Sequence, residues 1–188
     1  AGTNTSFTLT NDSAIAWAWG TNYYLTLGAN GQGALDRTNG WNAAGSSVVI
    51  TATPSNHWTF SNWSGQTSGC VIAGNVITAA MTQARSIQAT FALDRHTLQI
   101  VSARGIATPV VGLYTNDYGT ELTNRVSEQQ TVGTTQYLCS GWAMASNTPL
   151  TGGTTNMTMT LTNNAVLTWT WGTNYGLDTS TLGSSGSV

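Results

Sequence analysis

Two stretches of the chain share one alternation of apolar and small or polar positions. Residues 14–19 read AIAWAW, and residues 166–171 read VLTWTW. Every second side chain is large and apolar, which is the period of a β-strand with one buried face. We therefore predict a strand in each stretch. The side chains predicted to be buried are Ile15, Trp17, Trp19, Leu167, Trp169 and Trp171.

The alternation belongs to a longer internal repeat. Residues 7–25 align with residues 159–177 without a gap, at a shift of 152 positions (159 − 7 = 152). A fainter copy, IQATF at 87–91, lies 72 positions after the first (87 − 15 = 72) and 80 before the second (167 − 87 = 80). Repetition of this kind indicates that the chain is built from repeated structural modules. The predicted divisions are closing strands of a preceding repeat at 1–22, β modules at 23–94 and 95–172, and the opening strand of a following repeat at 173–188.

The rest of the chain shows the same strand pattern in shorter stretches, which are separated by Gly-, Asn- and Pro-rich turns. Only residues 126–130 could form a turn of helix. The prediction is an all-β fold of two tandem small β modules, of β-sandwich or β-grasp-like type, with extra terminal strands shared with neighbouring modules or subunits. The further strands are predicted at 3–9, 23–27, 48–53, 58–63, 76–81, 86–92, 97–100, 137–142 and 157–161.

The composition limits the possible cellular locations of the protein and the classes of partner that it can bind. Only 6% of the residues are charged, the formal net charge is −2, and all five basic residues are arginine. The absence of a basic patch argues against nucleic acid, and no apolar run reaches the length of a membrane span. A chain rich in Thr, Ser, Asn and Gly is typical of an extracellular or cell-surface location.

The groups that carry chemistry are few and scattered. His57 and His96 fall at non-equivalent positions of the repeat, and the acidic residues do not recur between the modules. A metal or catalytic site needs several convergent groups, so we predict no catalytic, cofactor or metal site and no enzymatic activity. Cys139 takes the place of Phe60, whereas Cys70 lies in a loop, which leaves open both a Cys70–Cys139 disulfide and two free thiols.

Most of the tryptophans have a predicted place in a core. Trp63 and Trp142 occupy matching positions of the two modules (142 − 63 = 79), which predicts that both are buried. Trp41 differs, because it lies in a Gly-rich stretch and has no counterpart in the repeat. Trp41 is therefore the candidate for a glycan contact, since sugars stack on exposed aromatic rings.

Three segments together resemble a known repeat. Residues 48–54 (VVITATP), 58–65 (WTFSNWSG) and 86–91 (SIQATF) are similar to the divergent internalin-type B-repeat of bacterial surface proteins. The resemblance is best over residues 23–92 and weaker over 97–172, where the aromatic spacing is kept. It implies small β modules in tandem on long secreted or wall-attached proteins, and it implies no active site.

These observations favour a non-catalytic structural protein of an extracellular fibre, stalk or surface layer. The alternative is a carbohydrate-binding or adhesion module of a larger secreted protein. The chain starts and stops within a repeat, so we expect it to polymerise head to tail by strand sharing, with other copies or neighbouring repeats as its partners. The predicted assembly residues are Phe7, Leu9, Ile15, Trp17, Trp19, Leu177 and Leu182.

Overall fold

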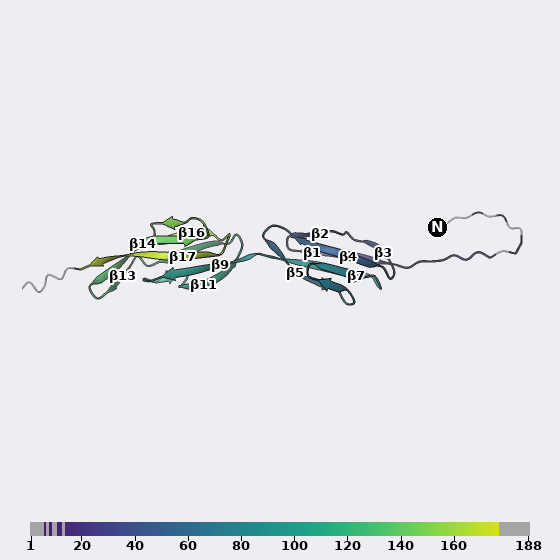
Figure 1. The fold of residues 1–188 in the computed structure, drawn as a ribbon, viewed down its shortest axis with the longest axis horizontal. Helices are drawn as coiled ribbons and strands as arrows, with labels where there is room; N and C mark the ends of the chain where they lie inside the picture. Colours follow the sequence, from purple (N-terminus) through teal and green to yellow (C-terminus); the bar gives the residue numbers. More distant parts are fainter. Residues whose placement is uncertain (1–5, 7, 9–10, 13, 177–188) are drawn as a thin grey trace, which may run out of the picture. The chain divides into compact units, whose positions relative to one another are not determined.

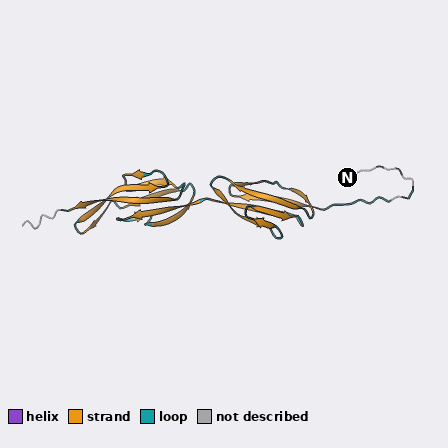
Figure 2. Cartoon of the chain, viewed as in Figure 1, coloured by secondary structure: helices purple, strands orange, loops and turns teal. Residues whose placement is uncertain are grey.

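The fold was analysed in a computed structural model, in which all described regular structure is β (Figures 1 and 2). The chain divides into two units, one formed by Ala1–Pro54 with Phe60–Phe91 and the other by Ser55–Thr59 with Ala92–Val188. Each unit is built from β-sheets alone, as the alternating pattern predicts. The residues that the structure describes are 6, 8, 11–12 and 14–176.

The first unit contains two four-stranded sheets, ordered β3-β1-β8-β5 and β2-β4-β7-β6. Alternate side chains of its longer strands point into the core, as in β8, where Ile87, Ala89 and Phe91 are buried. The strands are β1 (Asn22–Asn30), β2 (Gly33–Leu35), β3 (Gly40–Ala43), β4 (Ser47–Pro54), β5 (Trp58–Gly65), β6 (Val71–Ala73), β7 (Val76–Ala80) and β8 (Arg85–Leu93).

The second unit also contains two sheets, but the strands at the edges of these sheets differ from those of the first unit. One sheet follows the order β11-β9-β17-β14-β13, with β15 paired to β14, and the other follows β10-β12-β16. Residues 126–130 form no helical turn, because β12 ends and β13 begins within them. The strands are β9 (Arg95–Ser102), β10 (Ala107–Thr108), β11 (Gly112–Asp117), β12 (Glu121–Val126), β13 (Gln129–Val132), β14 (Thr135–Ala145), β15 (Thr151–Gly152), β16 (Asn156–Thr160) and β17 (Ala165–Tyr175).

The last strand of each unit lies in the middle of a sheet, next to the first. β8 runs parallel to β1, from the pair Leu25 and Arg85 to the pair Asn30 and Thr90. β17 likewise runs parallel to β9, and its other edge pairs antiparallel with β14. We call β8 and β17 the closing strands. Each closing strand is a central strand, so its backbone can bond on both edges.

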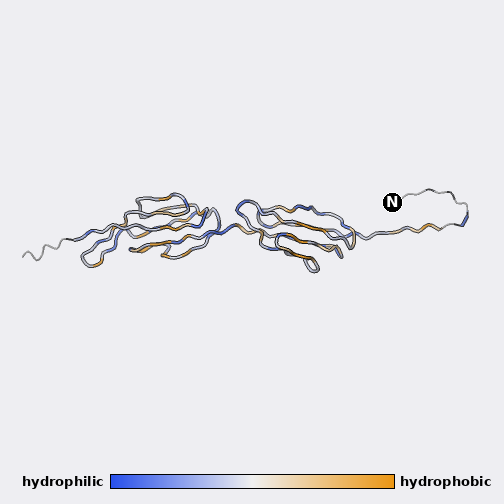
Figure 3. Tube along the Cα trace, viewed as in Figure 1, coloured by the Kyte–Doolittle hydropathy of each residue, from blue (hydrophilic) through white to orange (hydrophobic). Residues whose placement is uncertain are grey.

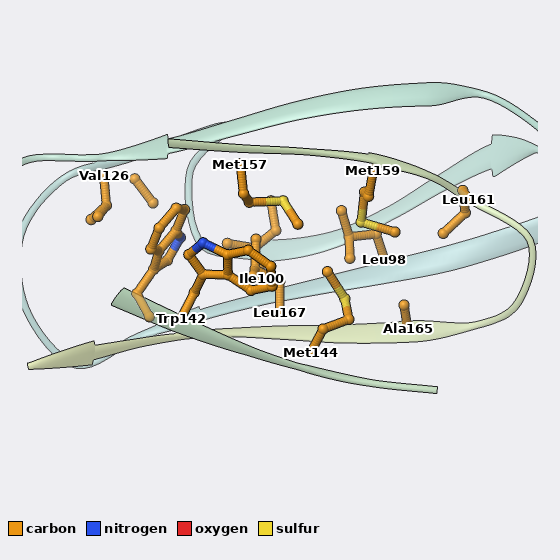
Figure 4. Packing of buried hydrophobic residues seen from close by; sticks show 12 residues of the cluster. Leu98, Ile100, Val126, Trp142, Met144, Met157, Met159, Leu161, Ala165 and Leu167 are labelled. Carbon is orange, nitrogen blue, oxygen red and sulfur yellow. The ribbon is translucent and has the colours of Figure 1, made fainter. Parts of the chain in front are cut away.

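The core of the second unit lies between its two sheets. Figure 4 shows Met157 and Met159 of β16 pointing toward Leu98, Ile100 and other side chains of the facing sheet. Two sheets that share one apolar core form a β-sandwich, which is the first of the two predicted types. The buried cluster consists of Leu98, Ile100, Ala107, Val126, Trp142, Met144, Met157, Met159, Leu161, Ala165, Leu167 and Trp169. Figure 3 shows hydrophobic residues recurring along the strands of both units.

The predicted burial of tryptophan is confirmed for Trp63, Trp142 and Trp169. Trp171 is only half-buried, and Trp17 and Trp19 are exposed. The predicted strand at 14–19 is also absent, since residues 14–21 form no strand. The prediction failed because alternation specifies which face of a strand can be buried, and burial itself requires neighbouring strands.

A polar side chain, Asn124, occupies the core of the second unit. It is the fourth residue of β12 and pairs opposite Met157, just as Ile50 is the fourth residue of β4 and pairs opposite Ile77. Asn124 Nδ2 donates to Met157 Sδ at 3.4 Å, which is the one hydrogen bond of this carboxamide within the described part of the chain. Sulfur is a weak acceptor, so a fully buried amide is poorly satisfied here.

Replacing Asn124 with isoleucine is expected to stabilise the second unit by about 1–3 kcal/mol, because it removes a poorly bonded buried amide. A cavity of about 100 Å³ borders this residue and leaves room for the bulkier, β-branched side chain. Urea unfolding of the full chain measures the change. Ile50→Asn is the matched reverse substitution and is expected to destabilise. A lower unfolding free energy for Asn124→Ile would show that the amide is satisfied.

Candidate functional site

An exposed apolar segment precedes β1 in the first unit. Ile15, Trp17 and Trp19 are 51%, 55% and 93% exposed. Figure 2 draws this stretch as loop ahead of β1. Clustered exposed apolar side chains are a common feature of interaction surfaces, which makes this segment a candidate site. The other predicted assembly residues, which are Phe7, Leu9, Leu177 and Leu182, lie outside the described residues.

The matching stretch of the repeat is buried in β17. Leu167 is fully buried, Trp169 is 2% exposed, and half-buried Trp171 donates its indole N–H to Ser102 Oγ at 3.1 Å. The side chains of the two stretches follow one pattern, but β17 lies between β9 and β14. Residues 14–20 have no strand beside them in the described part of the chain, and the carbonyl of Thr21 accepts from the N–H of Ala44, just after β3, at 2.8 Å. The segment therefore has the side chains of a central strand without the neighbouring strands.

Chain connectivity gives the segment the same place as a closing strand. β8 ends at Leu93 and β9 begins at Arg95, so a closing strand leads directly into the next opening strand. Residues 14–21 lead into β1, which begins at Asn22, in the same way. This connection follows from the repeat, because both copies continue with Gly-Thr-Asn-Tyr after the second tryptophan.

Trp41, the candidate glycan contact, lies on an edge strand of the first unit. It belongs to β3 rather than to a loop, and it pairs opposite Tyr24 of β1. The two rings meet edge to face, with 5.2 Å between their centroids and 69° between their planes. Trp41 is 71% exposed, so most of its indole is free to contact a ligand.

A shallow hollow lies along β1, next to the residues that lead into β3. Its volume is about 340 Å³, and it is lined by Leu27, Gly28, Ala29, Leu35, Arg37, Thr38 and Asn39. Asn39 Oδ1 accepts a hydrogen bond from the backbone N–H of Leu27 at 2.7 Å. Arg37 Nε donates to the carbonyl of Val49 at 3.2 Å. No sequence pattern marked Tyr24, Arg37 or Asn39 as site residues, because they are grouped by the pairing of β1 with β3 and by the connection that leads into β3.

The other candidate groups form no cluster. Cys70 and Cys139 are both free and half-buried, and they belong to different units. Among the described residues, no group of three or more His, Cys, Asp or Glu side chains is placed to hold a metal ion. The lack of enzymatic activity remains a prediction.

The geometry defines a class of protein, which is a tandem arrangement of small all-β modules. Residues 23–95 match the divergent InlB B-repeat domain family, a family of repeat domains in bacterial surface proteins. The resemblance stated from the three sequence segments is thereby confirmed for the first unit. No curated protein and no solved structure matches the chain. None of the described residues forms a helix long and apolar enough to cross a membrane.

Proposed function

We propose that this chain is a structural repeat protein of the bacterial cell surface. In this proposal, tandem β-sandwich modules form a fibre, stalk or surface layer and complete one another by sharing closing strands. The supporting observation is the exposed segment 14–21, which copies the buried closing strand β17. The family of residues 23–95 supports the surface location.

The partner of the segment is a module body with an open place for a central strand. Such a body would carry an opening strand like β9 and an antiparallel strand like β14. Binding there would pair the backbone of the segment on both edges, which is strand addition. Burial of Trp17 in the place of Trp169 would contribute about 2–3 kcal/mol, whereas Trp19 would be half-buried, as Trp171 is. The body belongs to a neighbouring repeat or to a second copy of the chain.

The register of this strand addition follows from the repeat. Trp17 would take the place that Trp169 has beside β9 and β14, and Ile15 would take the place of Leu167. Ile and Leu have equal volume, and such swaps are well tolerated in cores. Between these positions the segment has alanines where β17 has threonines, so no larger side chain enters the sheet.

The first test is association of the full chain. We expect concentration-dependent assembly in sedimentation velocity and electron microscopy, and we expect Trp17→Thr with Trp19→Thr to abolish it. Trp41→Thr is the matched control, because it removes an exposed tryptophan outside the segment. Assembly that is unchanged in the Trp17/Trp19 variant contradicts sharing of this strand between copies.

A peptide test covers the case in which the partner is a neighbouring repeat. The acceptor is the full chain with Leu167→Asp, whose own closing strand no longer fits the core. A peptide of residues 3–22 is expected to bind this acceptor, as is a peptide of residues 155–174 with the native sequence of β17. A 3–22 peptide with both tryptophans replaced by threonine is expected not to bind. The proposal is wrong if the 155–174 peptide binds and the native 3–22 peptide does not.

A further inference from the structure

The exposed aromatic pair of the first unit is not required by the fold. Leu25 and Leu98 are equivalent, because each pairs with the first residue of its closing strand, which is Arg85 in one unit and Ala165 in the other. The residues before them are therefore equivalent as well, so that the pair of Tyr24 and Trp41 corresponds to the pair of Thr97 and Thr115. The second unit builds the same strand pair from two threonines.

The hollow beside the aromatic pair also arises where the two units differ. β11 pairs with β9 as far as Ile100, whereas β3 pairs with β1 only as far as Leu25. Beyond Leu25, β3 no longer pairs with β1. The backbone N–H of Leu27 donates instead to Asn39 Oδ1. The hollow of about 340 Å³ follows this uncovered edge.

The aromatic pair and the hollow are adjacent. Asn39, which lines the hollow, is followed by Gly40 and then by Trp41, and Gly40 pairs with Leu25 directly beside Tyr24. One ligand can therefore contact the exposed indole and the rim of the hollow together. The volume lies at the lower end of the range for small-ligand sites, about 300–1,000 Å³.

Polar groups on the rim have hydrogen-bonding capacity to spare. Arg37 uses Nε for the carbonyl of Val49, and its two terminal nitrogens have no hydrogen bond or ion pair within the described part of the chain. Thr38 and Asn39 are exposed beside it. A guanidinium presents donors in a planar fork, which suits two neighbouring oxygen atoms of one ligand.

We propose that the Trp41–Tyr24 pair and this hollow form a saccharide-binding site. A sugar ring has an apolar C–H face, which would lie on the exposed indole of Trp41. Its hydroxyl rim would accept from Arg37 and exchange hydrogen bonds with Thr38 and Asn39. Aromatic surface next to a few fixed polar groups is the usual composition of a small-ligand site. This site is independent of strand sharing, because it uses no residue of the 14–21 segment.

The test is binding of the full chain to immobilised saccharides. The probes are bacterial cell-wall polysaccharides, glycosaminoglycans, and N- and O-linked glycans on one array. The chain is expected to bind at least one class saturably, and Trp41→Ala is expected to weaken that binding at least tenfold. Arg37→Gln is expected to weaken it several-fold, whereas Trp41→Phe, which keeps an aromatic ring, is expected to stay within a few-fold of the native chain.

Two control variants distinguish loss of saccharide recognition from loss of folding and from non-specific binding by exposed indole rings. Tyr24→Thr with Trp41→Thr reproduces the residues of the second unit, so this variant is expected to fold normally and to lose binding. Trp19→Ala removes an indole that is 93% exposed elsewhere in the chain, and it is expected to leave binding unchanged. Absence of saturable binding on the whole array, or equal losses for Trp41→Ala and Trp19→Ala, would overturn the proposal.

Discussion

Replacing Trp169 with alanine is expected to lower the unfolding free energy of the second unit by about 3–5 kcal/mol, the range for large-to-small changes in a core. Trp169 is fully enclosed between the sheets and pairs opposite Trp142. Its indole N–H is buried without a hydrogen-bond partner, so the stabilisation comes from the area and volume of the ring. Urea unfolding followed by far-UV circular dichroism measures the loss.

The repeat supplies an unusually close control for this experiment. Trp17 is the repeat counterpart of Trp169, yet it is 55% exposed. Trp17→Ala is therefore expected to change the unfolding free energy of the monomer by less than about 1 kcal/mol. Trp169→Phe, which keeps a ring and removes the unpaired N–H, is expected to fall between the native chain and Trp169→Ala. Equal effects of the two alanine substitutions would contradict the burial described for β17.

Replacing Arg85 with alanine is expected to lower the stability of the first unit by about 3 kcal/mol, because it removes a buried donor group that three backbone carbonyls share. The buried guanidinium donates from Nε to the carbonyl of Ala80 at 2.7 Å, and from Nη1 to the carbonyls of Gln66 and Ser68 at 2.8 Å each. Nη2 donates to Thr82 Oγ1 at 3.4 Å. Chemical unfolding with a probe in the first unit measures the loss.

Arginine geometry, and not only positive charge, is expected to matter at this position. Arg85→Lys keeps the charge but cannot reach three backbone carbonyls from one planar group, so we expect it to cost about 2 kcal/mol. Exposed Arg125 is the control, and Arg125→Ala is expected to stay within about 0.5 kcal/mol of the native chain. A lysine variant as stable as the native protein would show that the fork of hydrogen bonds contributes little.

The long strands could be predicted because their own residues carry the signal. The predicted strand at 86–92 is observed as β8, Arg85–Leu93, and the one at 166–171 is observed within β17. In both, large apolar side chains alternate with small or polar ones, which fixes the strand and its inward face. The all-β class followed from the same pattern, since no stretch has helical periodicity.

The short strands and the hollow could not be predicted, because other parts of the chain create them. The Gly-rich stretch around Trp41 has no alternation of its own, and it becomes β3 by pairing with β1. Likewise, the hollow exists because β3 begins only at Gly40, the partner of Leu25, and leaves the rest of the β1 edge uncovered. Residues 14–19 show the reverse case, since their pattern is that of a strand but the neighbouring strands are absent from the described residues.

The parallel pairing of first and last strands determines how each unit responds to mechanical force. When the chain is stretched, force acts on the start of β1 and on the end of β8. These two points lie at opposite ends of the parallel pair. Tension therefore slides the two strands past each other and loads the bonds from Leu25 to Asn30 together, in shear, instead of opening them one at a time. β9 and β17 have the same arrangement. Each unit is thus built to resist stretching along the chain.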